Sequence, residues 1–97
     1  MRRWLLRRSP LVPEISRFYG IVIKMYFADH APPHFHAEYA EYEARFAIYS
    51  LAVITGSLPP RAMRLVEEWA MLHQQELQVL WDKASRLEAL HRIDPLP

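Results

Sequence analysis

Alternating apolar and polar positions dominate the first half of the chain and predict β-strands. The segment from Ile15 to Phe27 is predicted to form one long first strand. Its odd-numbered positions are all apolar between Tyr19 and Phe27. Two further alternating runs, His34–Tyr39 and 42–48, predict the second and third strands. A short fourth strand is predicted at 52–54, ended by a turn over 55–57.

The two residues between the second and third runs, Ala40 and Glu41, predict a tight hairpin. Its register pairs Tyr39 with Tyr42, Phe35 with Phe46, His36 with Arg45 and Glu38 with Glu43. Two glutamates directly opposite one another are unfavourable, and Gly or Asn normally supplies the positive φ of such a turn. A longer loop or a bulge is therefore an alternative at this turn.

The second half of the chain changes to helical spacing. Pro59-Pro60 is typical of a helix start, and neither Gly nor Pro occurs between Arg61 and Leu90. Apolar residues recur at helical intervals: Ala62, Val66, Trp69, Leu77, Leu80, Ala84 and Leu87. One helix of this length would be ~45 Å long, whereas a domain of this size is only ~30 Å across. We therefore expect a break near 73–75, with a loose tail over 93–97.

Strands that come first and helices that come last predict an α+β fold. We expect an antiparallel meander of three to four strands, followed by one long or two short C-terminal helices packed on one sheet face. Residues 12–97 are predicted to form a single domain, preceded by a basic leader at 1–11. No apolar run approaches the ~18–20 residues of a membrane span.

Charge is distributed unevenly between the leader and the body. Residues 1–11 carry four arginines and no acid, whereas 12–97 carries eight basic and 11 acidic residues, a net charge of −3. The leader is expected to be disordered or a misassigned start, with translation beginning at Val12; the alternative is a basic arm for nucleic acid or an anionic surface. The acidic body disfavours a broad phosphate-binding surface.

Three of the five histidines gather at 30, 34 and 36. If the second strand begins at His34, then His34, His36 and Glu38 share one face, with His30 nearby in the preceding loop. Imidazole and carboxylate ligands in this pattern suit zinc, nickel, copper or iron(II), and the chain has no cysteine to supply a thiolate site. The alternative is that these are surface polar residues and that no cofactor is bound.

A metal-free site is a second interpretation of the same strand face. His34 or His36 would act as general acid or base, because imidazole titrates near neutral pH. Arg17, Arg45 and Tyr19 would hold a phosphate or another anion. This set would suit a metal-independent ribonuclease, although a nucleic-acid partner has little other support in the sequence.

Three residues of the helical region are candidates for partner binding: Trp69, His73 and Trp81. Exposed tryptophan is typical of protein interfaces, whereas buried tryptophan belongs to a core. His73, which lies on the apolar stripe, is more often a hydrogen-bonded boundary residue than a ligand.

Three motifs in order resemble the bacterial domain of unknown function 4160 family. They are Ile15–Ile21, the segment His30–Ala37, and Gly56–Pro59 followed by Arg61-Ala62 and Trp69. The resemblance extends from about Val12 to Pro97. It carries over His30, His34, His36, Arg17 and Tyr19 as signature positions, without known catalytic roles.

The resemblance implies a small, cytoplasmic bacterial protein, one component of a toxin–antitoxin-like module. In that role it would bind a small protein encoded nearby, and a homodimer is also open. The alternatives from other classes are a metal-binding protein or metal-dependent hydrolase, and a metal-independent ribonuclease. Whether the protein is an enzyme is left open by the sequence.

Overall fold

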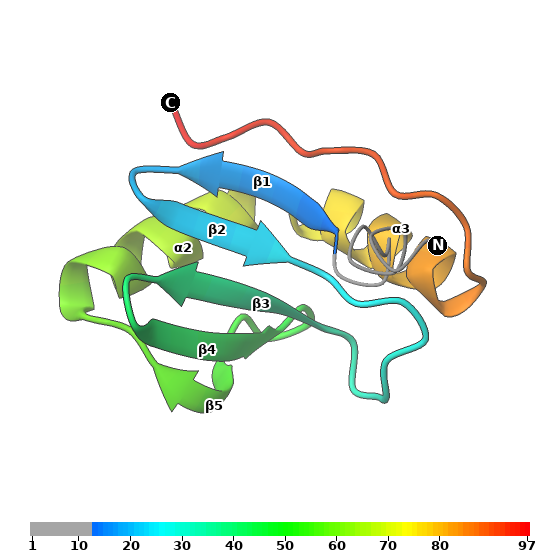
Figure 1. The fold of residues 1–97 in the computed structure, drawn as a ribbon, viewed down its shortest axis with the longest axis horizontal. Coiled ribbons are helices and arrows are strands. Elements are labelled where there is room, and N and C mark those ends of the chain that lie inside the picture. The colour runs from blue at the N-terminus through cyan, green and yellow to red at the C-terminus, as the bar shows by residue number, and fades with distance from the viewer. Residues whose placement is uncertain (1–12) are drawn as a thin grey trace, which may run out of the picture.

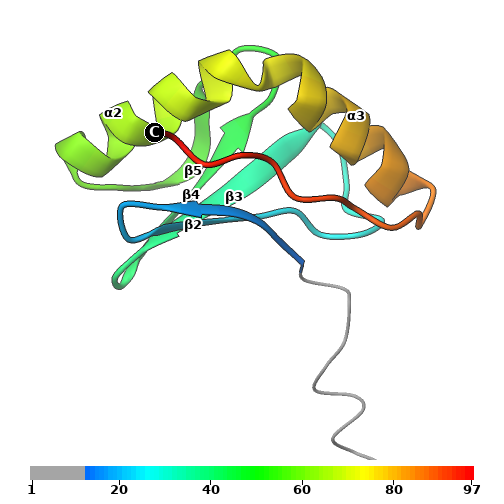
Figure 2. The ribbon, with the colours of Figure 1, turned by 90° about the horizontal axis from the view of Figure 1, so that it is seen from above.

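A computed structural model describes residues 13–97 as an antiparallel sheet with two helices on one face (Figures 1 and 2). The sheet has five strands in the spatial order β1-β2-β3-β4-β5. The elements are β1 Glu14–Phe18, β2 Ile21–Lys24, β3 His34–Tyr39, β4 Tyr42–Ala47, β5 Val53–Ser57, α2 Pro60–Leu72 and α3 Gln74–Ser85. The fold is α+β as predicted, with five strands instead of three to four. The predicted leader at 1–11 lies outside the described residues.

The additional strand arises because the run predicted as one strand is a hairpin. The chain reverses at Tyr19 and Gly20, whose φ angles are 50° and 81°. Glycine tolerates such an angle because it has no Cβ. Phe18, which is apolar out of phase with the odd-numbered positions, pairs with Ile21 across the turn, and both are buried. That phase change was the sequence signal for the turn.

The predicted register of the second hairpin is confirmed. Tyr39 lies opposite Tyr42 next to the turn, and the pairing of β3 with β4 continues to His34 opposite Ala47. Ala40 in the turn has a φ of 52°. β5 is longer than predicted, because Val53–Ser57 includes the expected turn. At Gly56 a Cβ would lie 2.2 Å from the Glu43 carbonyl oxygen, so only glycine lets β5 approach β4 this closely.

The predicted break between two helices is confirmed at His73. Leu72 ends α2, His73 has a non-helical φ of −122° and ψ of 23°, and Gln74 begins α3. The buried helical residues are Ala62, Val66, Trp69 and Ala70 on α2, and Leu77, Leu80, Trp81 and Ala84 on α3. They pack with inward-facing sheet residues such as Phe35 and Phe46 in one apolar core.

The C-terminal tail packs against the body, so the expectation of a loose tail is wrong. Ile93 is only 2% exposed, and its amide donates to the Ile15 carbonyl at 2.7 Å. The Trp69 indole N–H donates to the Asp94 carbonyl at 2.9 Å. These contacts carry the tail along β1 (Figures 1 and 2). Within residues 13–97, none of the helices has the length and apolarity needed to cross a bilayer.

Candidate functional site

β3 is buried on both of its faces, which distinguishes its first four residues from the rest of the sheet. Phe35 and Ala37 point into the apolar core and are 0% exposed. His34 and His36 point to the opposite face, yet they are only 1% and 2% exposed. Two imidazoles are therefore taken out of water without entering the hydrophobic core, and polar partners must compensate.

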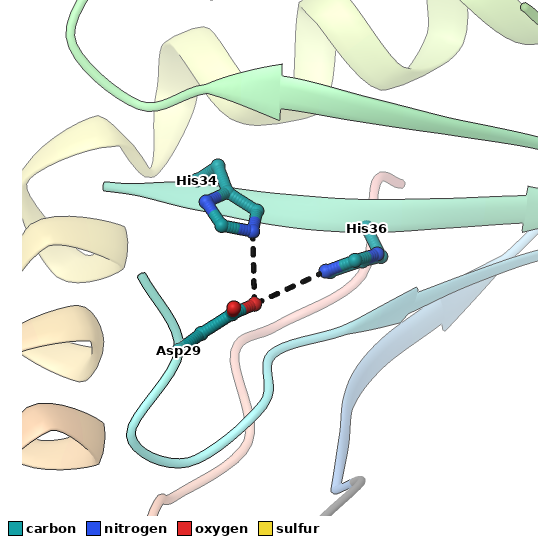
Figure 3. Close-up of side chains that lie close together, drawn as sticks. All are labelled: Asp29, His34 and His36. Carbon is teal, nitrogen blue, oxygen red and sulfur yellow. Dashed lines mark hydrogen bonds and ion pairs between the residues drawn. The ribbon is translucent and has the colours of Figure 1, made fainter. Parts of the chain in front are cut away.

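The cover over these histidines comes from the loop between β2 and β3. The Ala28 amide in this loop donates to the Ala84 carbonyl at the end of α3, at 3.1 Å. Phe27 packs against the edge of the core. These two contacts hold the loop so that Asp29 lies over His34 and His36 (Figure 3).

One carboxylate oxygen of Asp29 is the meeting point of the two imidazoles. Asp29 Oδ2 lies 3.0 Å from His34 Nε2 and 3.6 Å from His36 Nε2. Burial raises the pKa of Asp29, but the His30 amide hydrogen bond and the charges of the neighbouring histidines outweigh it. The pKa of Asp29 is therefore lowered overall, and the group is a carboxylate at neutral pH.

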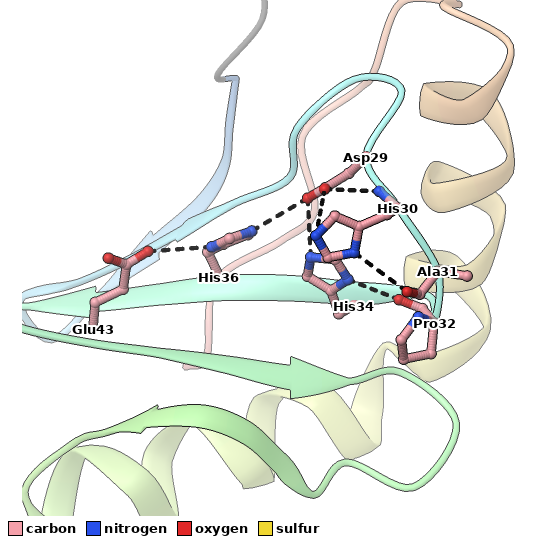
Figure 4. Close-up of polar contacts among 7 residues, drawn as sticks. All are labelled: Asp29, His30, Ala31, Pro32, His34, His36 and Glu43. Atoms are coloured by element: carbon pink, nitrogen blue, oxygen red, sulfur yellow. Dashed lines mark hydrogen bonds and ion pairs between the residues drawn. The ribbon is translucent and has the colours of Figure 1, made fainter.

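The opposite nitrogen of each imidazole is engaged on the outside of the cluster (Figure 4). His34 Nδ1 lies 2.7 Å from the Pro32 carbonyl oxygen, and His36 Nδ1 lies 3.2 Å from Glu43 Oε2. A carbonyl can only accept, so Nδ1 of His34 carries the hydrogen; the Glu43 carboxylate gives the same assignment for His36. Nε2 of each imidazole faces Asp29, where it carries a hydrogen if the ring is protonated and offers a lone pair if the ring is neutral.

His30 approaches the same carboxylate from the solvent side. Its Nε2 lies 3.7 Å from Asp29 Oδ1, and its Nδ1 lies 3.3 Å from the Ala31 carbonyl oxygen. Its side chain is 71% exposed, unlike those of His34 and His36. All three loop and strand histidines thus direct Nε2 toward Asp29 (Figure 4).

Aromatic neighbours fix the orientation of the two buried imidazoles. The His36 ring stacks on Tyr26 with centroids 4.3 Å apart and planes 6° apart. The His34 ring lies 5.2 Å from the ring of Trp81 on α3. Both imidazoles are therefore held in place before any ligand arrives.

The predicted ligand set overlaps this cluster without matching it. His34 and His36 belong to the group of side chains able to hold a metal ion, and the third member is Asp29. Glu38, which the strand pattern suggested, forms an ion pair with Lys24 at 3.1 Å instead. Asp29 was not among the predicted ligands, because its position over β3 depends on the path of the loop.

The candidate anion-binding residues are not gathered together. Arg45 is half-buried beside the cluster, directly opposite His36 on β4. Arg17 lies on β1 and pairs with Glu14 at 2.7 Å. Tyr19, at the β1–β2 turn, donates its hydroxyl hydrogen to the Pro97 carbonyl at 2.8 Å. Arg17 and Tyr19 therefore bind other parts of the protein.

The candidate partner-binding residues lie mostly inside the protein. Trp69 is 0% exposed and Trp81 is 8% exposed. His73 sits at the helix break, with 19% of its side chain exposed and its Nδ1 3.2 Å from Glu76. The tryptophans serve the core, and neither presents the exposed ring of an interface.

The family comparison agrees with the resemblance seen in the sequence. The family model described as Domain of unknown function (DUF4160) matches residues 20–82, and the chain belongs to this family. The match spans β2 to α3 and so includes Asp29, His34 and His36. No curated protein and no solved structure matches the chain. The family assignment brings no established activity with it.

Proposed function

We propose that the protein binds a divalent transition-metal ion between Asp29, His34 and His36. The observation that carries this proposal is the direction of the ring nitrogens. A carbonyl and a carboxylate lie within hydrogen-bond reach of Nδ1 on His34 and His36, so both Nε2 atoms face Asp29 and would offer lone pairs to a cation when the rings are neutral. Histidines that bind metals commonly hydrogen-bond through their other nitrogen in this way.

The separations between donor atoms also suit a shared ion. Ligands about 2.1 Å from a metal lie about 3.0 Å apart at an octahedral edge and about 3.4 Å apart at a tetrahedral edge. Nε2 of His34 and of His36 lie 3.0 and 3.6 Å from Asp29 Oδ2. The donor atoms of all three residues lie within 4.8 Å of one another, so small movements of the side chains would be needed to place them around one ion.

A cation would also satisfy His36 Nε2, which is buried and has no hydrogen-bond partner among the described residues. His30 is suited to be the fourth ligand, because its Nε2 faces Asp29 from the exposed side. A set of imidazoles and one carboxylate fits zinc, nickel, copper or iron(II).

The metal-free ribonuclease is less well supported by the geometry. Both ring nitrogens of His34 have protein partners. His36 Nε2 is buried beneath the loop. A general acid or base must come within hydrogen-bond reach of its substrate, which neither nitrogen offers in this conformation. A metal ion uses these buried lone pairs directly, so it explains the arrangement better.

Metal content and affinity test this function on the full chain, purified without a histidine tag. We expect the wild-type protein to bind zinc, nickel, copper or iron(II) near one equivalent by elemental analysis. Asp29→Ala, His34→Ala and His36→Ala should each abolish stoichiometric binding. Glu38→Ala is the matched control, because Glu38 shares the strand face but pairs with Lys24.

Circular dichroism of each variant separates a lost ligand from a lost fold. Wild-type protein that takes up none of the four metals after reconstitution would contradict the proposal. So would equal metal uptake by folded His34→Ala and His36→Ala. The cluster would then be an ion-paired cover over β3, with His34 or His36 protonated.

A toxin–antitoxin-like role through protein binding is the second candidate. Exposed apolar side chains near the helix break favour it: Tyr49 is 92%, Met71 70% and Leu72 66% exposed. A hollow of about 520 Å³ lies beside them, lined in part by Tyr49 and Gln74. Co-purification with the protein encoded next to it, lost in Met71→Asp, is the expected result. Growth arrest on expression, relieved by that neighbour, would identify the chain as the toxin.

A further inference from the structure

We propose that Arg45 forms an oxyanion subsite beside the Asp29–His34–His36 cluster and that the ligand is a phosphate monoester. This inference rests on the proposed metal function, since the phosphoryl group would lie between the guanidinium and the ion. Arg45 is directly opposite His36 in the β3–β4 ladder, which sets their Cβ atoms about 5 Å apart on one sheet face. An arginine side chain is long enough to bring its guanidinium from this position to the Asp29–His34–His36 cluster.

Arg45 is the half-buried cation on this face that lacks an internal partner. Within residues 13–97, no carboxylate lies within 4.0 Å of its guanidinium, and its side chain makes no hydrogen bond. Lys24, on the other side of His36, is neutralised by Glu38 at 3.1 Å. Glu43 shares the face with Arg45 but directs Oε2 to His36 Nδ1. A half-buried guanidinium left unpaired is suited to an external anion.

The loop covers the cluster from the side of β2, and Arg45 lies on the side of β4. Asp29 enters from the loop that follows β2, so it approaches β3 from the side of that strand (Figure 4). On the other side, β4 sets the small Ala47 opposite His34 and Arg45 opposite His36. Ala47 and Arg45 are each partly exposed, so a ligand would have to reach the metal from this side.

The charges at the subsite favour an anion. A divalent ion bound by Asp29 would keep one positive charge and Arg45 adds another, while the exposed Glu43 carboxylate on the same face brings one negative charge. A phosphate monoester is a dianion near neutral pH and offers oxygens to both the guanidinium and the metal. The net charge of −3 on residues 12–97 disfavours the long anionic backbone of a nucleic acid.

Isothermal titration calorimetry on metal-loaded full chain tests this subsite with inorganic phosphate, phenyl phosphate and dimethyl phosphate. We expect the first two to bind and Arg45→Gln to weaken both at least tenfold, with metal affinity unchanged. Dimethyl phosphate, a monoanionic diester that mimics the nucleic-acid backbone, should bind at least tenfold more weakly than phenyl phosphate. Arg64→Gln, an exposed arginine on α2 across the sheet, is the matched control.

The metal and the anion are measured separately, so the two proposals fail separately. Metal binding without phosphate binding, or with equal phosphate binding by Arg45→Gln, would overturn the subsite alone. Dimethyl phosphate that binds more tightly than phenyl phosphate would overturn the monoester assignment. If no metal binds, the metal proposal is wrong, and the same titrations on metal-free protein decide whether Arg45 still binds phosphate.

Discussion

The two faces of β3 are equally buried, but one carries apolar side chains and the other carries imidazoles. On one face, Phe35 is 0% exposed and stacks on Phe46 with ring centroids 5.2 Å apart. On the other, His34 and His36 are 1% and 2% exposed beneath Asp29. The first face is covered by helices (Figure 2), and the second is covered by Asp29 of the loop between β2 and β3 (Figure 3).

The two faces differ in what burial requires of their side chains. Apolar burial is favourable by about 25 cal/mol per Å² and needs no directional partner. Buried imidazoles gain nothing of this kind and require satisfied nitrogens. On the histidine face, Nε2 of His34 and of His36 lies close to the Asp29 carboxylate. Under the proposed function, a cation would bind between these three groups.

The largest effect is expected on the apolar face. Phe35→Ala should lower the free energy of unfolding by about 3–5 kcal/mol, because it removes a fully buried ring from between Phe46 and Trp69. Urea denaturation with and without metal checks this. The loss should be the same in both conditions, and a metal-dependent loss would mean that the two faces are coupled.

A smaller, metal-dependent effect is expected on the histidine face. Free metal at one hundred times its dissociation constant should raise the wild-type free energy of unfolding by about 2.7 kcal/mol, because it binds only the folded state. In His34→Ala this increment should vanish. Thermal denaturation of each protein with metal and with a chelator measures it. An equal increment in the variant would show that the metal binds elsewhere.

The outer hydrogen bond of His36 is expected to tune the metal rather than hold the fold. Glu43→Ala should weaken metal affinity about 10- to 100-fold, since the carboxylate orients His36 through Nδ1. Glu41→Ala, at the exposed β3–β4 turn, is the control and should change nothing. Competition with a chromophoric chelator gives both affinities. Unchanged affinity in Glu43→Ala would remove Glu43 from the site.

The smallest effect is expected at Glu14 on β1, away from both groups of buried side chains. The Arg17 hydrogen bond, aided by Arg92 and opposed by partial burial, lowers the pKa of Glu14 to about 2. Both arginines are exposed, so solvent screening reduces the stabilisation to about 1 kcal/mol. Metal affinity should be unaffected by Glu14→Gln.

The sign of this effect follows from the lowered pKa. The ordinary pKa of the group is 4.5, so the stabilisation is fully present above that pH and is lost as the pH falls toward about 2. Glu14→Gln should therefore be less stable than wild type at pH 7 and equal to it near pH 2. Urea denaturation across this range tests it; a constant difference would indicate lost packing instead of lost charge.

Much of the fold was readable from local patterns. Alternation located β3 and β4 and their register, since each partner can be counted from a two-residue turn. The helix break near His73 followed from length alone. The first hairpin was missed because only one apolar residue, Phe18, marks the change of phase at the turn. Two of the three members of the candidate cluster were also predicted, because strand parity set His34 and His36 on one face.

The third member of the cluster depended on the loop. Glu38 shares strand parity with the histidines, but it lies two residues further along β3, within reach of Lys24. Asp29 is five residues before His34 in the chain, and no local pattern brings it above the strand. The Ala28 contact with α3 does so, since it ties the loop to an element more than fifty residues later.

Local chemistry along the chain therefore determined which residues form strands and helices, which side chains share a face, and that no thiolate site exists. Tertiary structure alone decided which carboxylate meets the histidines, that His34 and His36 are buried, and that Arg45 has no ion-pair partner within residues 13–97. The physical reason is the sequence separation over which each kind of contact acts. Backbone geometry repeats every two or 3.6 residues, whereas the path of a loop depends on contacts between distant segments.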